Sequence, residues 1–348
     1  MRQSLLLTIV ALFSYSALEA QDIHFSQFYA APLNLNPALT GVMNANQRIS
    51  ANYRNQWASV LRNDAFSTYN AAYDQRIAVG RYDFIGVGGS LWGDKAGSLN
   101  FNTTQVNASI SYSKRMGGYR SSSDYLVLGF DAGVSQRGLD LAAARWGSQN
   151  NGGTWDPTKP SEELQFAQRN NFIYPEVAAG LMWFSVINER NNWYIGGAYS
   201  HINRANQSFT NTTYVPLSSK FTVHAGGEFE MAERVSLLPG AVVFLQGPSK
   251  EINFGTSMRF KLGASRIQEE GIQFGLWSRL SNKINNGLLM DALIISTRFD
   301  YNDFSIGFSY DVNVSPLNAA SHSNGGFEFS LIYKIIGPES RDVYCPNF

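Results

Sequence analysis

The stretch NDFSIGFSYDVN, residues 302–313, alternates between apolar side chains and small or polar ones. Phe304 and Ile306 share one face of an extended chain, and Ser305 and Ser309 share the other. This period of two predicts a β-strand whose faces meet two different environments. The polar face is small and carries little charge, which suits the concave interior of a closed barrel better than the wet face of a soluble sandwich.

Segments with the same period recur along the chain, each bounded by Gly, Asn, Asp or Pro. They exceed the usual length of soluble strands and are long enough to cross a bilayer when tilted. We therefore predict an all-β fold, a transmembrane antiparallel up-and-down β-barrel of about 14 strands, with an N-terminal plug-like or docking segment. The predicted strands are residues 47–57, 65–77, 83–93, 98–114, 124–136, 174–186, 192–203, 219–231, 234–246, 250–263, 271–281, 287–299, 302–313 and 325–337.

The composition agrees with a barrel and excludes several other classes of protein. Aromatic residues make up 14% of the chain and charged residues 16%, with 31 glycines. After the N-terminus no segment offers the roughly 18 consecutive apolar residues of a transmembrane helix. The 27 basic and 27 acidic side chains balance, and this neutrality argues against a nucleic-acid partner. The single cysteine, Cys345, excludes an intrachain disulfide and a cysteine-based zinc site.

The first 20 residues have the pattern of a secretory signal peptide. Arg2 supplies the positive start, Leu5–Phe13 is an apolar core too short to span a bilayer, and Ala20 is the small residue expected at a cleavage site. The mature chain then begins at Gln21. The expected organisation is a signal peptide at 1–20, an N-terminal periplasmic or luminal segment at 21–46, an outer-membrane barrel at 47–337 and a periplasmic tail at 338–348.

The predicted connections differ in length in an ordered way. An even strand number puts both termini on one side, the periplasmic side, so that odd-numbered connections lie outside the cell. Connections 137–173, 204–218 and 314–324, the longest, are all odd-numbered. The first of them contains Trp146 and Trp155, and tryptophans in so long a loop indicate that it folds onto the barrel mouth or onto a partner.

Catalytic and metal-binding patterns are missing from the sequence, so we expect no enzyme, no metal and no cofactor. His224 shares its predicted face with Glu228 and Glu230; a metal or acid–base site there stays open, but we favour a hydrogen-bonded luminal histidine. Luminal charges of mixed sign favour an internal ion-pair network, or a polar groove that seats a plug or a passing chain, over a strongly ion-selective pore. These charges are Arg54, Asp74, Asp131, Glu176, Glu228, Glu251, Arg259, Lys261, Arg279, Asp311, Glu328 and Lys334.

The stretch QDIHFSQFYAAPLNLNPALTG, residues 21–41, fits neither a strand nor a helix. It alternates poorly, and Pro32 and Pro37 interrupt any helix. Its aromatic and apolar side chains nevertheless indicate an ordered structure. We expect it to dock inside or beneath the barrel and to plug or brace the lumen from the periplasmic side.

Short motifs at both ends of the chain carry a resemblance to a known family. They are Ser26-Gln27-Phe28, Asn36-Pro37-Ala38, Thr40-Gly41, Tyr53-Arg54-Asn55-Gln56-Trp57 and Tyr344-Cys345-Pro346-Asn347-Phe348. Together they resemble the PorP/SprF family of type IX secretion proteins, and the resemblance covers essentially the whole chain. Asn347 departs from the basic residue usual at its position.

The resemblance implies a non-enzymatic outer-membrane barrel, embedded in outer-membrane lipid, of Bacteroidetes-type bacteria that serves type IX secretion or gliding motility. Its partners would be the periplasmic ring and peptidoglycan-binding proteins of the machine, or a secreted adhesin-like cargo with a C-terminal sorting domain. We expect the motif residues to form a plug or docking surface, and Trp146 and Trp155 to contact cargo. The alternative function is a passive porin or transporter for small solutes.

Overall fold

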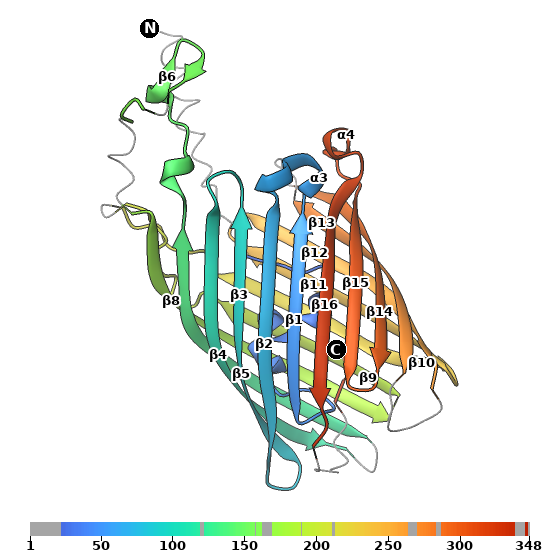
Figure 1. Cartoon of the computed structure of the whole chain (residues 1–348). Coiled ribbons are helices and arrows are strands. Elements are labelled where there is room, and N and C mark those ends of the chain that lie inside the picture. The colour runs from blue at the N-terminus through green and yellow to red at the C-terminus, as the bar shows by residue number, and fades with distance from the viewer. Residues whose placement is uncertain are drawn as a thin grey trace.

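The computed structural model describes residues 22–118, 122–156, 158–161, 169–188, 190–210, 213–263, 270–282, 287–337 and 345–346. Within this part of the chain, fourteen strands form one closed antiparallel barrel in which each strand pairs with its neighbours in chain order. The barrel closes between its first and last strands, where Gln47 pairs with Ile335 and Gln56 pairs with Gly326. The predicted up-and-down barrel is confirmed, and Figure 1 shows its long strands.

The barrel strands are β1 (Gln47–Gln56), β2 (Phe66–Val79), β3 (Asp83–Ala96), β4 (Phe101–Gly117), β5 (Ser123–Gly138), β8 (Asn171–Asn188), β9 (Asn191–Ser200), β10 (Lys220–Ala232), β11 (Val235–Gln246), β12 (Ser249–Lys261), β13 (Gly271–Asn282), β14 (Leu288–Tyr301), β15 (Phe304–Asn313) and β16 (Asn324–Ile335). A separate hairpin joins β6 (Asn150–Asn151) to β7 (Thr154–Trp155). The short helices are η1 (Phe28–Ala30), α2 (Pro32–Leu35), η2 (Pro37–Leu39), α3 (Ala58–Leu61), η3 (Arg62–Asp64), η4 (Leu141–Ala143), η5 (Gly147–Gln149) and α4 (Asn318–Ser321).

The two faces of each strand meet the environments that the alternation predicts. On β15, the exposed fractions of Phe304 and Ile306 are 46% and 55%, whereas those of Ser305 and Ser309 are 7% and 0%. The large apolar side chains therefore point outward, where a bilayer covers them, and the small polar ones point into the lumen. A bilayer-facing exterior explains why so much apolar surface is exposed on a chain whose lumen side is polar.

The long connections gather at one end of the barrel. Residues 139–170, 201–219 and 314–323 join strands at the end that also carries α3, and we call this the long-loop end. The opposite, short-turn end has tight connections except at 262–270. Apart from that connection, the long connections lie at one end and the short ones at the other, as the sequence predicts. The β6–β7 hairpin stands away from the barrel at the long-loop end in Figure 1.

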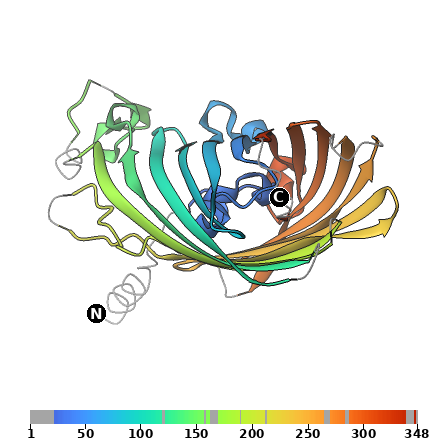
Figure 2. The same ribbon diagram turned by 90° about the horizontal axis from the view of Figure 1, so that it is seen from below.

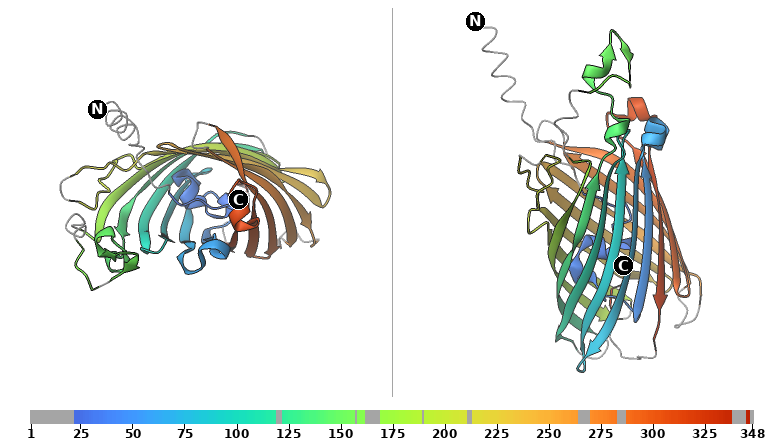
Figure 3. Two further views of the ribbon diagram at one scale, coloured as in Figure 1. Left: turned by 90° about the horizontal axis from the view of Figure 1, so that it is seen from above. Right: turned by 60° about the vertical axis from the view of Figure 1, so that its left-hand side comes forward.

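The apolar core of the molecule lies in the lumen. Phe28, Leu35 and Leu39 of the N-terminal stretch pack in one buried cluster with wall residues that include Tyr125 and Phe184. Figure 2, seen from below, shows these N-terminal turns inside the ring of strands, and the left view of Figure 3 shows the same from above. The barrel is therefore built around the first part of its own chain.

The direction of this N-terminal stretch corrects one expectation. The backbone N–H of Asp22 donates to Gln246, the last residue of β11, at 2.9 Å, which places Asp22 at the long-loop end. At the short-turn end, the amide of Asn46 donates to Ile335 at 3.0 Å, and Cys345 contacts Asn44. The expectation that the stretch enters the lumen from the end that holds the C-terminal tail is therefore wrong, because residues 22–46 run the length of the lumen.

Candidate functional site

The candidate site is the interface between the barrel wall and residues 22–46, which we call the luminal segment. Its local structure follows from its prolines. Pro32 is the first residue of α2, and Pro37 is the first residue of η2. At this position a backbone N–H would have no partner within the helix, so proline costs no hydrogen bond. Between them Asn36 is extended, and its side-chain oxygen accepts from the N–H of Ala38 at 2.9 Å. The segment is thus a chain of single turns, short enough to bend within the lumen.

Ser26 and Gln27 bind one carboxylate on the last strand. The Glu328 side chain accepts the backbone N–H of Ser26 at 2.7 Å and that of Gln27 at 3.0 Å. The Gln27 side chain also donates to the Glu328 carbonyl at 3.2 Å and accepts from the Ser330 hydroxyl at 2.8 Å. All four residues are buried, so these hydrogen bonds supply partners that their polar groups would otherwise lack.

A buried charge cluster surrounds the Ser26 hydroxyl, which donates to Asp311 at 2.8 Å. Asp311 also accepts from Arg54 at 3.2 Å and from Arg279 at 2.8 Å. Arg54 donates a short bond to the backbone carbonyl of His24. Arg54, Arg279 and Asp311 of the wall therefore hold Ser26 and His24 of the segment in place. Removing any one of these three charged side chains would leave a buried charge without its partner.

The Asn36-Pro37-Ala38 turn docks against the opposite wall. The Asn36 side-chain amide lies 3.2 Å from the carbonyls of Leu181 and Gly197, on β8 and β9, and 3.0 Å from His224 Nε2 on β10. His224 therefore contacts the segment. Glu228 pairs with Arg259 at 2.8 Å, and Glu230 pairs with Arg190. These two carboxylates therefore do not join His224 in the metal or acid–base site that the sequence left open.

Wall glycines allow the segment to approach the strand backbone. A Cβ atom at Gly180 would lie 1.9 Å from Asn36 Oδ1, and one at Gly129 would lie 2.3 Å from the Ala38 nitrogen. A Cβ at Gly86 would lie 2.1 Å from the Thr40 carbonyl oxygen. At these positions a side chain and the segment exclude each other, which explains glycine in the middle of three strands.

Thr40-Gly41 forms a third docking point. The Gly41 N–H donates to Asp74 at 2.7 Å, and Arg48 binds the same carboxylate at 2.8 Å. Arg48 also donates to the carbonyl of Leu39 at 3.1 Å. Gly41 has a φ of 72°, a left-handed conformation that favours glycine. The turn can therefore point its N–H at the buried Asp74.

Phe28 fills the middle of the lumen. Its ring meets the Trp277 ring edge to face, with centroids 5.5 Å apart, and Tyr29 lies 5.6 Å from the same tryptophan. Burial raises the pKa of Tyr29 to about 12. Trp277, on β13, was not among the sequence-predicted site residues, although its inward position follows from the alternation of its strand.

At the short-turn end, the C-terminal tail contacts the segment. Asn44 donates to the Cys345 carbonyl at 2.7 Å, and Arg76 lies 3.7 Å from the Cys345 sulfur. Burial raises the pKa of the Cys345 thiol, although Arg76 opposes this. Pro346 is also buried, whereas Phe348 lies outside the described residues. Cys345 is therefore a buried thiol beside the end of the luminal segment.

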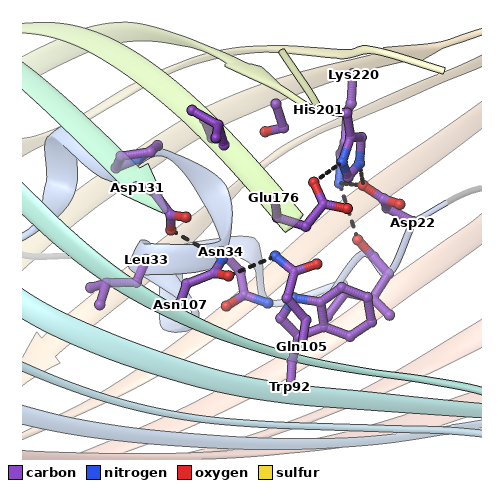
Figure 4. Close-up of a pocket in the computed structure, with 15 residues that line it drawn as sticks. Asp22, Leu33, Asn34, Trp92, Gln105, Asn107, Asp131, Glu176, His201 and Lys220 are labelled. Carbon is purple, nitrogen blue, oxygen red and sulfur yellow. Dashed lines mark hydrogen bonds and ion pairs between the residues drawn. The ribbon is translucent and has the colours of Figure 1, made fainter. Parts of the chain in front are cut away.

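At the long-loop end, Asp22 and Glu176 flank His201 (Figure 4). The His201 ring nitrogens lie 2.5 Å from Asp22 and 2.6 Å from Glu176. Burial alone would lower the pKa of His201, but the two carboxylates outweigh it and raise the pKa to about 10. Burial of Asp22 acts to raise its pKa, yet His201 and Lys220 together hold that pKa below its usual range. The pair therefore ties the start of the segment to the barrel rim.

The other sequence-predicted site residues lie away from this interface. Tyr53 faces outward with an exposed fraction of 42%, and Trp57, predicted in the first strand, lies just beyond β1 with a φ of 66°. Trp146 and Trp155 belong to the connection between β5 and β8. There the Trp155 ring donates to Gln149 at 3.2 Å and stacks under Arg145 at 5.0 Å.

Sequence reasoning missed Asp22 and Arg48 as contact residues. The alternation of β1 places Arg48 inside, two positions before Ser50, but nothing in the sequence indicates its partner. Among the described residues, no three His, Cys, Asp or Glu side chains converge on a metal-sized space. No helix in the same ranges has the length and apolarity to cross a membrane.

The fold and this interface define an outer-membrane β-barrel whose lumen holds an N-terminal segment. The sequence model of the type IX secretion system membrane protein PorP/SprF matches residues 17–333, and the chain belongs to that family. The resemblance found in the sequence is thereby confirmed, and it supports an outer-membrane location.

Several solved structures resemble the chain at low sequence identity. The CymD monoaromatic hydrocarbon channel has 11% identity and a TM-score of 0.48, covering 89% of this chain and 94% of its own. The Pseudomonas putida toluene transporter TodX has 10% identity and a TM-score of 0.45, covering 91% and 98%. CdiB from Escherichia coli has 10% identity and a TM-score of 0.46, covering 82% and 63%. Likenesses at this level carry no argument about function. No curated protein matches the chain.

Proposed function

We propose that this barrel is a non-enzymatic attachment component of type IX secretion or gliding machinery. It holds a secreted, adhesin-like cargo, chiefly through the connection 139–170, or docks periplasmic machine components, and it does not conduct solutes. The family match supports a place in the secretion system, and the machine partners follow from it. The finer role rests on the observation that the lumen holds the chain's own luminal segment, anchored to strands on several sides.

An occupied lumen separates this proposal from the alternative, a passive porin for small solutes. A porin needs a continuous aqueous path, whereas Phe28 packs against Trp277 in mid-lumen and Leu39 has an exposed fraction of 0%. The Asn36 side chain contacts β8, β9 and β10 on one side of the lumen, and the Ser26 backbone N–H binds Glu328 of β16 on the opposite side. A barrel filled in this way is suited to present its ends to protein partners.

The connection 139–170 is the candidate cargo contact. It carries the β6–β7 hairpin, and its described part includes both Trp146 and Trp155. Its base is narrow, because the Leu139 N–H donates to the Asn170 carbonyl at 2.9 Å and Gly138 pairs with Asn171. The barrel strands therefore need nothing from the loop to stay in register.

The test replaces residues 139–170 with Asn-Gly, a two-residue turn that closes a hairpin between paired strands. We expect the variant to reach the outer membrane and to lose surface retention of the cargo. The matched control replaces 314–323 in the same way, since that connection lies at the same end and lacks tryptophan. Normal retention in the first variant, with the barrel present at normal level, would reject the loop as the cargo contact.

A further inference from the structure

A cavity lies between the luminal segment and the wall (Figure 4). Its lining residues His201 and Lys220 place it in the half of the lumen nearer the long-loop end. Its empty volume of about 540 Å³ includes space that is open to solvent. The segment contributes Asp22, Ile23, Leu33, Asn34 and Pro37 to the lining, and the wall contributes residues of β3, β4, β5, β8, β9 and β10. The docking contacts described above leave this space unfilled.

The lining holds three carboxyl groups and two basic side chains. Asp22, Asp131 and Glu176 face it, against His201 and Lys220. Both of these cations are directed at Asp22, at 2.5 Å and 3.8 Å, and His201 also contacts Glu176 Oε2. Within the described residues, no cation lies within ion-pair distance of Asp131, whose exposed fraction is 5%.

The lining also offers hydrogen-bond acceptors that lack donors. Glu176 has an exposed fraction of 3%, and its Oε1 atom accepts no hydrogen bond from a described residue. The same holds for Asn34 Oδ1. Asp131 accepts one bond, from Asn107 at 3.1 Å. A buried carboxylate oxygen without a donor is costly, so we expect the cavity to hold a donor, which is either water or a ligand.

The rest of the lining is mixed: Trp92 and Leu33 are apolar, and Gln105, Asn107 and Ser200 are polar. This combination suits an organic cation better than a bare metal ion, because methylene groups pack on apolar side chains while a charged head binds carboxylates. An ammonium presents three N–H donors and a guanidinium five, and neither accepts. Trp92 adds an aromatic ring of the kind that attracts such cations.

We propose that this cavity binds an alkylammonium or alkylguanidinium group, with Asp131 and Glu176 Oε1 as its principal acceptors. The group belongs either to a free amine or to the lysine or arginine side chain of a polypeptide that enters from the long-loop end. The site is distinct from the loop contact in the proposed function and does not depend on it.

The test uses the full barrel in detergent micelles and ligand-observed NMR with n-butylammonium and n-butylguanidinium. We expect saturable binding of both, no binding of the neutral n-butylurea, and at least tenfold weaker binding in Asp131→Asn and Glu176→Gln. The matched control is Asp94→Asn, a wall carboxylate of β3 that bonds Thr68 and does not line the cavity. Heat-dependent mobility on gels confirms that each variant is folded.

Three outcomes would overturn the proposal: equal binding of n-butylurea, equal displacement of the ligand by sodium at the same concentration, or unchanged affinity in folded Asp131→Asn. A second arm identifies the source. If the peptide Gly-Gly-Lys-Gly-Gly displaces n-butylammonium and its norleucine counterpart does not, the site takes a polypeptide side chain. If neither peptide competes while n-butylammonium still binds, the site takes a free amine.

Discussion

The Glu328 carboxylate accepts the backbone N–H of Ser26 at 2.7 Å, although the two residues lie 302 positions apart in the chain. Glu328 belongs to β16, the strand that also closes the barrel by pairing with β1. The luminal segment therefore completes its contacts only when the last strand is in place. Barrel closure and docking of the segment are coupled through Glu328 and its neighbour on the same strand, Ser330.

The first prediction concerns that carboxylate. Glu328→Gln replaces one of the two acceptor oxygens with an N–H₂ group, which then faces a backbone N–H of Ser26 or Gln27. A buried backbone N–H that loses its acceptor costs about 1–3 kcal/mol, so we expect roughly five- to hundredfold faster amide exchange over residues 25–30. Hydrogen exchange with mass spectrometry measures this. Glu230→Gln, at a partly exposed pair with Arg190, is the control and should leave these rates unchanged.

The second prediction concerns close packing. The Cβ of Gly129→Ala would lie 2.3 Å from the Ala38 nitrogen and 2.5 Å from its Cα, so backbone must move. We expect a loss of stability of about 1–3 kcal/mol, read as a lower thermal unfolding midpoint. Gly117→Ala, whose Cβ would meet its nearest atom at 3.6 Å, should leave the midpoint unchanged. Equal midpoints for the two variants would show that the segment does not pack against β5 as described.

Much of this fold was predictable from the sequence because a barrel repeats one rule. The period of two gave the strand segments and the inward position of Asp311 and Glu328, since every strand has one polar face. The pairings across the lumen were not predictable, because they join residues far apart in the chain. The end from which residues 22–46 enter the lumen was mispredicted for the same reason. The contact of Asp22 with His201 that fixes this end forms only when the strands of the barrel have come together.

The third prediction is a pH dependence of the link between Asp22 and His201. The pKa of His201 is raised to about 10, so its stabilising effect is complete below about pH 6.5, its ordinary pKa, and is lost as pH rises through 10. The pKa of Asp22 is lowered, so its contribution is present above its ordinary value of 3.8 and is lost as pH falls below it. His201→Gln should therefore lower the unfolding midpoint at pH 6.5 and have little effect at pH 10.5.

The comparison with His201→Gln at each pH removes the effects of other titrating groups, because they change the wild type and the variant alike. His322→Gln serves as the control, since that histidine is exposed at the long-loop end. A midpoint difference that stays constant from pH 6.5 to pH 10.5 would contradict the link.

The fourth prediction tests whether the luminal segment closes the barrel. Deleting residues 22–41 abolishes the ring contact between Phe28 and Trp277 and the hydrogen bond from the Gly41 N–H to Asp74. The remaining lumen is lined by small polar side chains and by charges of both signs, so we expect open, weakly ion-selective channels in planar bilayers where the full barrel shows none. The barrel in which Asn-Gly replaces residues 139–170 is the control, because it alters the same end and leaves the lumen filled. A deletion variant that shows heat-dependent gel mobility and still fails to conduct would mean that the wall alone closes the lumen.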